Sequence, residues 1–240
     1  NKRMEIFNIL KKQGYEILII PSIDEITNGK AKIDLLRPIL IEDLLSRNSV
    51  SSDPRLLGPG ISNKSICVTG AGGSIGSEIC RQLVFFKPKR IILIELCEHN
   101  LYIINKELEK YSANNIEIIP ILGNVSNYKF MELTLKKYEV QIIYHAAAYK
   151  HVPLVERNPV EGILNNILTT KTVCEISKNL LIQEIILLSS DKAVRPTSVM
   201  GVSKRISELI FQAFAEKVQQ DDYPFIKYSM VRFGNVLGSS

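Results

Sequence analysis

The sequence contains no apolar run long enough to cross a membrane, since a transmembrane helix needs about 18 such residues. An early apolar stretch, residues 17–20, has only the length of a strand. No secretory signal is recognisable, because charged and apolar residues are mixed from the first position onward. With 45% hydrophobic and 23% charged residues among 240, the composition is that of an ordinary globular protein.

Cysteine, histidine and clustered charge are also scarce. The four cysteines form no C-x-x-C pair, and the three histidines are not spaced as zinc ligands. We therefore expect free, buried thiols in a reducing compartment and no metal site. The net charge of +5 is spread along the chain. This distribution indicates solvated surface charge or a site for a small anionic ligand, and it argues against nucleic acid as a partner.

From residue 64 onward, short apolar runs rich in β-branched residues alternate with helical patterns. The expected strands are 65–69, 90–95, 116–121, 141–145, 184–189 and 226–232. The expected helices between them are 74–86, 99–111, 128–137, 160–179 and 199–218. Most of the strands are apolar throughout, as strands covered on both faces are. The alternation predicts an α/β fold with a doubly wound parallel sheet.

Residues 1–60 follow a different pattern. A helix is expected over 2–13 and a strand over 15–20, followed by a mixed segment over 34–45 and a turn-rich connector over 51–60. We interpret residues 1–60 as the end of a preceding linker domain plus a connector, and 61–240 as a separate domain.

A glycine-rich loop joins the first expected strand of the second domain to its first helix. Glycine lets the backbone approach a pyrophosphate closely, and the following helix N-terminus offers it free N–H groups. A plain turn between strand and helix is the alternative. The loop residues expected to contact a dinucleotide are Gly70, Gly73, Ser74, Ile75 and Gly76.

Residues after the neighbouring strands complete the expected dinucleotide site. Glu95 ends the next strand, where its carboxylate can accept from the adenosine ribose hydroxyls. No arginine follows it to meet a 2′-phosphate, which favours NAD and leaves NADP as the alternative. Asn124 and Val125 are placed to contact the adenine, unless they form a simple loop. Ala146 and Ala147 follow a strand end and are expected to lie close to the cofactor.

Three segments, 145–159, 190–201 and 231–240, carry a family resemblance. They resemble the nucleotide-sugar 4,6-dehydratases of bacterial polysaccharide biosynthesis, which are extended short-chain dehydrogenases acting on UDP-N-acetylglucosamine. The resemblance covers nearly the whole chain. It implies a Rossmann-type NAD(P)-binding domain over 61–240, a hydro-lyase that makes a 4-keto-6-deoxy sugar, and a homo-oligomer. It also implies that helices 99–111 and 160–179 form the contacts between the subunits.

Met200 stands where short-chain dehydrogenases have a catalytic tyrosine, four residues before Lys204. A thioether cannot donate or accept a catalytic proton, so we expect Met200 to form a wall of the substrate pocket. The exchange resembles the large, membrane-anchored branch of the family. That branch implies a catalytic domain at the cytoplasmic face, an inner-membrane anchor through a segment absent from this chain, and a substrate pocket completed by C-terminal segments beyond it.

The resemblance assigns the chemistry to residues near Met200. Lys192 is expected to remove the proton from carbon 5 of the sugar, with a pKa lowered by the nicotinamide and Lys204. Asp191 is expected to protonate the leaving hydroxyl, with a pKa raised by burial against the cofactor. Ser190 is expected to bind near carbon 4, and Lys204 to bind the nicotinamide ribose. Two candidates stay open for the group that accepts the 4-hydroxyl proton. One is Asp191, and the other is a water molecule that relays the proton to Lys204.

Further positions follow from the same resemblance. The expected substrate contacts are Lys150, His151, Arg195, Met200 and Asn235. Asn166 corresponds to the family's structural asparagine, with Asn165 as the competing assignment. Glu95, Asn124 and Ser190 depart from the aspartate, aspartate and threonine that are usual at these places. Two other functions stay open: a nucleotide-sugar epimerase, and a non-catalytic module that binds a dinucleotide.

Overall fold

A computed structural model describes residues 6, 9–10, 12–15, 17–19, 37–38, 53–111, 116–220 and 226–236. The chain divides into two units, Asn1–Ser52 and Asp53–Ser240. In the first unit, β1 (Leu18–Ile19) pairs antiparallel with β2 (Arg37–Pro38). Much of the helix expected over 2–13 and of the segment 34–45 lies outside the described residues.

The second unit begins with a helix, α4 (Pro54–Ile61), and not with the turn-rich connector expected over 51–60. The side chain of Asp53 caps α4 by accepting from the backbone N–H of Arg55. Pro54 at the first helical position needs no such partner, since it has no N–H to satisfy. The same residues that suggested a turn therefore act here as helix-start signals.

A six-stranded parallel sheet forms the centre of the second unit, in the order β5-β4-β3-β6-β7-β8. Its strands are β3 (Ser65–Thr69), β4 (Arg90–Glu95), β5 (Glu117–Leu122), β6 (Ile142–His145), β7 (Glu184–Ser190) and β8 (Lys227–Phe233). The chain runs outward from β3 to β5 and then returns to place β6 on the other side of β3. Ligands of open α/β sheets bind at the carboxyl ends of the strands at such a reversal.

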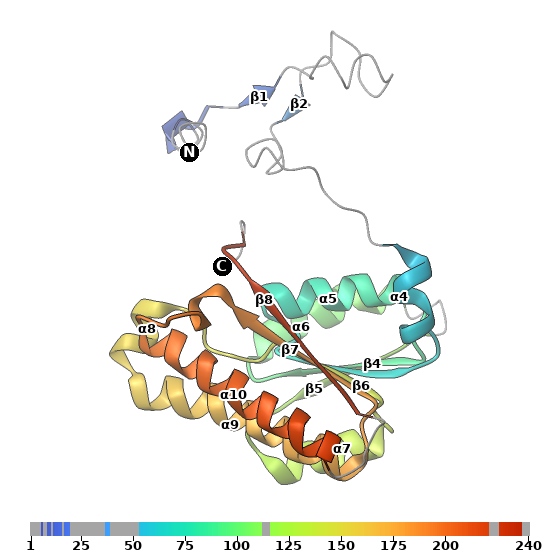
Figure 1. Ribbon diagram of the computed structural model, residues 1–240. Helices are drawn as coiled ribbons and strands as arrows, with labels where there is room; N and C mark the ends of the chain where they lie inside the picture. The colour runs from blue at the N-terminus through green and yellow to red at the C-terminus, as the bar shows by residue number, and fades with distance from the viewer. Residues whose placement is uncertain are drawn as a thin grey trace. The chain divides into compact units, whose positions relative to one another are not determined.

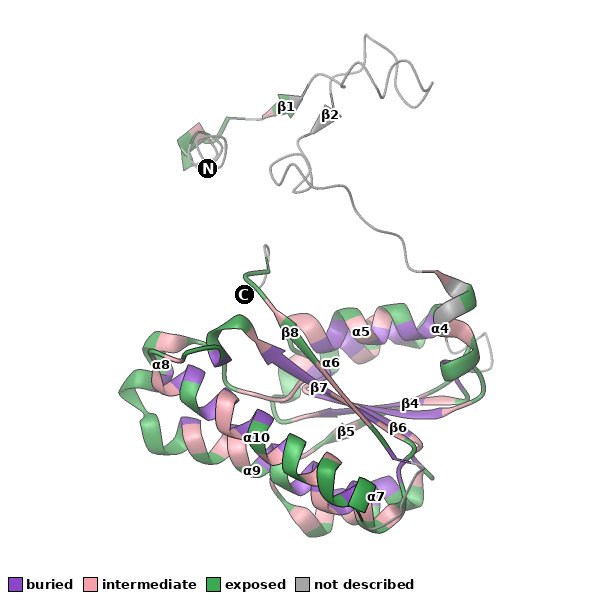
Figure 2. Cartoon of the chain, in the orientation of Figure 1, coloured by how far each residue is buried: buried purple, intermediate pink, exposed green. Residues whose placement is uncertain are grey.

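Helices cover both faces of the sheet (Figure 1). One face is covered by α5 (Ser74–Phe85) and α6 (Glu98–Glu109). The other is covered by α7 (Tyr128–Lys137), α9 (Pro159–Leu180) and α10 (Val199–Gln220). Alternate residues of β3 enter the two cores: Ile66 and Val68 pack with α5 and α6, and Cys67 packs with the opposite layer. Figure 2 shows the buried stretches of β4 and β7 in purple.

The sequence-based fold prediction is confirmed. Every expected strand and helix of the sheet domain is found, with ends within two residues of the expected ones. Two short elements were not expected: α8 (Val152–Arg157) and a 3₁₀ turn, η2 (Asp191–Ala193). Both are too short to give a periodic signal. None of the helices in the described ranges combines the length and the apolarity needed to cross a membrane.

Candidate functional site

The glycine loop after β3 packs tightly against the segment after β6. Gly70 has a φ of +65°, and a Cβ there would lie 2.8 Å from the backbone nitrogen of Ala147. A Cβ on Gly76 would collide with the carbonyl oxygen of Gly70. No side chain caps the N-terminus of α5, which begins directly after Gly73. The loop is therefore a cradle that side chains would fill, next to the N-terminus of a helix, which suits a pyrophosphate.

The Glu95 carboxylate links this loop to the start of α6. One oxygen accepts from the backbone N–H of Gly72 at 3.0 Å. The other accepts from the N–H groups of Leu96 and Cys97 at 2.9 and 3.1 Å. An ionised carboxylate has about four acceptor sites, so one stays available for a ribose hydroxyl.

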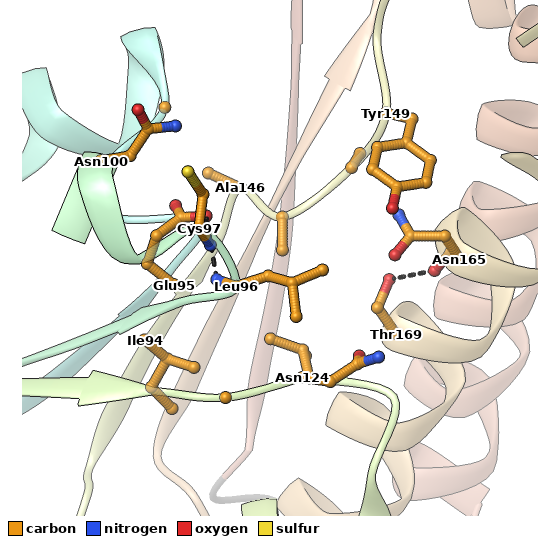
Figure 3. Close-up of a pocket in the computed structure, with 16 residues that line it drawn as sticks. Ile94, Glu95, Leu96, Cys97, Asn100, Asn124, Ala146, Tyr149, Asn165 and Thr169 are labelled. Atoms are coloured by element: carbon orange, nitrogen blue, oxygen red, sulfur yellow. Dashed lines mark hydrogen bonds between the residues drawn. The ribbon is translucent and has the colours of Figure 1, made fainter.

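A pocket of about 410 Å³ opens at the carboxyl ends of β3, β4, β5 and β6 (Figure 3). It is lined by Gly70, Gly73, Ile94, Glu95, Leu96, Cys97, Asn100, Gly123, Asn124, Val125, Ala146, Ala147, Ala148, Tyr149, Asn165 and Thr169. Seven of the expected cofactor contacts are among them: Gly70, Gly73, Glu95, Asn124, Val125, Ala146 and Ala147. Ser74, Ile75 and Gly76 lie beside it at the start of α5, and Lys204 does not line it.

Several lining residues were missed from the sequence. Asn165 and Thr169 lie on α9, across the pocket from Leu96 and Cys97 in Figure 3. Their spacing of four residues puts both on one helix face, which is a signal that could have identified them. Asn100 lies in the first turn of α6 and packs against the glycine loop. A Cβ added to Gly72 would lie 2.5 Å from the Cβ of Asn100.

Asn166 holds the segment after β6 against α10. Its Oδ1 accepts from the backbone N–H of Tyr149 at 2.7 Å, and its Nδ2 donates to the Tyr149 carbonyl at 3.1 Å. The same Nδ2 donates to Ser203 Oγ at 2.9 Å. These contacts support Asn166 as the structural asparagine, because the competing Asn165 lines the pocket instead.

The Asp191–Lys192 pair lies in η2, directly after β7. Lys192 Nζ lies 3.3 Å from Asp191 Oδ1 and donates to Asn235 Oδ1 at 2.8 Å. The Ser190 hydroxyl donates to Asp191 Oδ1 at 3.0 Å. These hydrogen bonds from Ser190 and Lys192 lower the pKa of Asp191, which is opposite to the expected raised value. The carboxyl is about half exposed, so burial does not outweigh them.

Lys204 is buried four residues after Met200, which is itself buried. Its Nζ donates to the carbonyl of Leu188 at 2.7 Å. Burial lowers the pKa of Lys204 to about 8, against the opposing effect of Glu208. The ammonium group thus lies near the carboxyl end of β7, at Leu188, which is two residues before Ser190.

The remaining expected substrate contacts flank these groups. Lys150 Nζ reaches Ser74 Oγ at 3.4 Å, which brings the segment after β6 to the start of α5. His151 is exposed at the beginning of α8. Arg195 is exposed and has a φ of +49°, a left-handed conformation rarely adopted without glycine. Such local strain tends to accumulate at functional sites.

Three of the four free cysteines are buried, as expected, but Cys97 is exposed. It lies at the N-cap of α6, where the chain leaves the sheet and borders the pocket. Within the described residues, no group of three or more His, Cys, Asp or Glu side chains could hold a metal ion.

Comparison with known proteins gives four informative matches. The sequence profile of a family described as "Polysaccharide biosynthesis protein" matches residues 66–240. The "Capsular polysaccharide biosynthesis protein CapD" of Staphylococcus aureus is 43% identical over 235 residues, which are 98% of this chain and 38% of CapD. The chain therefore spans less than two fifths of that relative.

Solved structures show the same fold. Pen from Bacillus thuringiensis superposes with a TM-score of 0.67 and 27% identity, over 75% of this chain and 54% of that one. The UDP-Glc/GlcNAc 4-epimerase of Campylobacter jejuni superposes with a TM-score of 0.65 and 19% identity, over 74% of this chain and 55% of that one.

Proposed function

The chain belongs to the polysaccharide biosynthesis protein family, and from that premise we propose that it is the cofactor-binding part of a UDP-N-acetylglucosamine 4,6-dehydratase. The observation that carries the proposal is the placement of Asp191 and Lys192. They lie at the carboxyl end of β7, two strands from the glycine cradle in the same sheet. Met200, where related dehydrogenases have a tyrosine, leaves this pair as the proton-transfer groups.

NAD is the cofactor that the residues fit. The cradle of Gly70 and Gly76 suits a pyrophosphate, and Glu95 has an acceptor site left for a ribose hydroxyl. The Glu95 carboxylate would repel a 2′-phosphate, which disfavours NADP. When bound, NAD supplies reversible hydride transfer with the sugar.

The lowered pKa of Asp191 suggests how the pair divides the work. An ionised Asp191 accepts the proton of the 4-hydroxyl as carbon 4 is oxidised. The resulting 4-keto group acidifies carbon 5, and Lys192 removes that proton. Asp191 then gives its proton to the leaving 6-hydroxyl, which departs as water. Lys192 finally returns its proton to carbon 5 as carbon 6 takes back the hydride that was removed from carbon 4, so both groups end as they began.

Product mass tests the proposal on the full-length protein incubated with UDP-N-acetylglucosamine. We expect loss of one water from the sugar nucleotide. An isomer of unchanged mass would identify an epimerase, and tight NAD binding with no conversion would identify a binding module.

The Lys192→Ala variant should abolish dehydration. The matched control is Lys171→Ala, because Lys171 is an exposed lysine of α9 that pairs with Glu175 on the same helix. Dehydration by the Lys192→Ala variant at the wild-type rate would contradict the assigned base.

A further inference from the structure

Glu208 is a fully buried carboxylate on α10, one helical turn after Lys204. Its Oε1 accepts from Ser189 Oγ and from Arg232 Nε, both at 2.7 Å. Its Oε2 accepts from Arg232 Nη2 at 2.7 Å and from Arg205 Nη1 at 3.0 Å. A buried charge persists only when it is paired and hydrogen-bonded, and this one uses both oxygens.

The partners of Glu208 lie on the two strands that carry the proposed reaction. Ser189 and Arg232 face each other in the β7–β8 register. The chain continues from Ser189 directly into Ser190, Asp191 and Lys192. From Arg232 it continues within three residues to Asn235, the hydrogen-bond partner of Lys192. One carboxylate on α10 therefore joins both strand ends just before the Lys192–Asn235 contact.

The charge of Glu208 is permanent at physiological pH. Although burial would raise its pKa, hydrogen bonds from Arg232, Ser189 and Arg205 lower it to about 2. The pairing with Arg232 is bidentate, which fixes direction as well as distance. Arg205 is the partner that belongs to neither strand, since it lies on α10 itself.

We propose that Glu208 is a positioning residue, which holds β7 and β8 together so that Asn235 directs Lys192 toward the substrate. The inference rests on the proposed dehydratase function. Glu208 itself is buried and contacts no substrate. Its effect should fall mainly on the step that uses Lys192, because its strongest link is to the strand that presents Asn235.

Two measurements on the full-length protein test this inference, with Glu208→Gln as the variant and Arg205→Ala as the control. The first is hydrogen exchange, which needs no activity. In Glu208→Gln, the backbone amides at the carboxyl ends of β7 and β8 should exchange faster than in wild type. In Arg205→Ala they should be unchanged. Equal protection of these amides in Glu208→Gln and wild type would overturn the positioning role, whatever the protein's reaction is.

The second measurement combines steady-state and single-turnover kinetics with UDP-N-acetylglucosamine. We expect kcat of Glu208→Gln to fall about 10- to 100-fold, because small misplacements of a reacting group have such effects. KM should change little, and the absorbance of reduced cofactor should build up before product forms. A general loss of structure would instead slow cofactor reduction and product formation together, and that result would overturn the inference.

The two proposals fail differently. Faster exchange in Glu208→Gln, with no dehydrated product even from wild type, would support the role of Glu208 in holding β7 and β8 together. The same result would reject the dehydratase function. If Glu208→Gln does not fold, Ser189→Ala removes only the β7 contact and should give the same buildup of reduced cofactor, to a smaller extent. Wild-type kinetics in Ser189→Ala would then contradict the positioning role of Glu208.

Discussion

The Nζ of Lys192 lies 2.8 Å from Oδ1 of Asn235, although the two residues come from different strand ends. Lys192 follows β7 and Asn235 follows β8, its parallel neighbour. Only the sheet brings them together. A lysine has four rotatable side-chain bonds, so a fixed acceptor such as this amide decides where the amine points.

Removing that acceptor should slow the reaction without loosening the cofactor. In the full-length Asn235→Ala variant, we expect turnover to fall about 10- to 100-fold, because Lys192 is no longer aligned. The affinity for NAD should stay within about twofold, since Asn235 lies on a different strand from the pocket of Figure 3. Product mass spectrometry and calorimetric NAD titration measure the two quantities. Asn179→Ala is the control, because Asn179 is an exposed amide bonded to Tyr128. A loss of NAD affinity alongside the loss of turnover would contradict the prediction that Asn235 acts on Lys192 and not on the cofactor.

Gly201 determines how closely α10 approaches the same lysine. A Cβ at this position would lie 2.5 Å from the carbonyl oxygen of Lys192. The Gly201→Ala variant should therefore push η2 away from α10 and reduce turnover at least about tenfold. NAD should still bind, because the glycine cradle lies at β3. Gly60→Ala is the matched control, since nothing lies within 4 Å of its added Cβ. Full activity of Gly201→Ala would show that η2 can shift without consequence.

The layered fold could be predicted from the sequence because its central strands are buried on both faces. The β3 residues are all buried, and the three between Ser65 and Thr69 are apolar, as expected for a strand covered on both faces. A helix such as α6 was equally clear, since its buried residues Leu101, Ile104 and Leu108 recur at helical spacing. Elements below this scale were not predictable. The single turns of η2 and α8 depend on local contacts, such as that of the Ser190 hydroxyl with the backbone N–H of Lys192.

The site was predictable where it follows strand ends and not where it depends on tertiary contacts. Gly70, Glu95 and Ala146 directly follow or end a strand, and all three line the pocket. The side-chain environment of Asp191 was not predictable in the same way. Its pKa depends on which way the Ser190 hydroxyl and Lys192 turn, and no sequence pattern encodes that orientation.

His145 should make the stability of the chain fall in acid. Burial, aided by the charge of Lys204, lowers its pKa to about 3 from an ordinary 6.5. Its Nδ1 lies 2.7 Å from Thr69 Oγ1, and its Nε2 lies 3.2 Å from Thr170 Oγ1. Because the Thr170 hydroxyl donates to the carbonyl of Asn166, it must accept from Nε2–H. Nδ1 is then the acceptor for Thr69, and protonating it would break that bond.

The sign of the pH effect follows from these values. Above pH 6.5 the imidazole is neutral in both the folded and the unfolded chain, so stability is fully present. Between pH 6.5 and about 3 only the unfolded chain takes up this proton. The free energy of unfolding should therefore fall by up to about 1.4 kcal/mol per pH unit from this group. Urea unfolding at pH 7, 6, 5 and 4 should show a shallower decline in His145→Asn. An unchanged slope in that variant would assign the acid sensitivity to other groups.

Lys204 should reduce stability at neutral pH. Burial lowers its pKa to about 8 from 10.5, so below pH 8 the chain carries the full cost of a buried ammonium. That cost disappears as the pH rises from 8 to 10.5, because the folded chain loses this proton near pH 8 and the unfolded chain loses it only near pH 10.5. The Lys204→Met variant removes the charge and keeps the volume. It also leaves the Leu188 carbonyl without its donor, which offsets part of the gain.

We therefore expect Lys204→Met to be about 1–2 kcal/mol more stable than wild type at pH 7, with the difference shrinking toward pH 10. Thermal unfolding of both chains at the two pH values measures this. Lys171→Met, on the exposed face of α9, should change stability by less than about 0.5 kcal/mol at either pH. If Lys204 binds the nicotinamide ribose, as the family resemblance implies, Lys204→Met should also bind NAD more weakly despite its higher melting temperature. A variant that is less stable at pH 7, by an amount independent of pH, would show that the Leu188 hydrogen bond outweighs the cost of the charge.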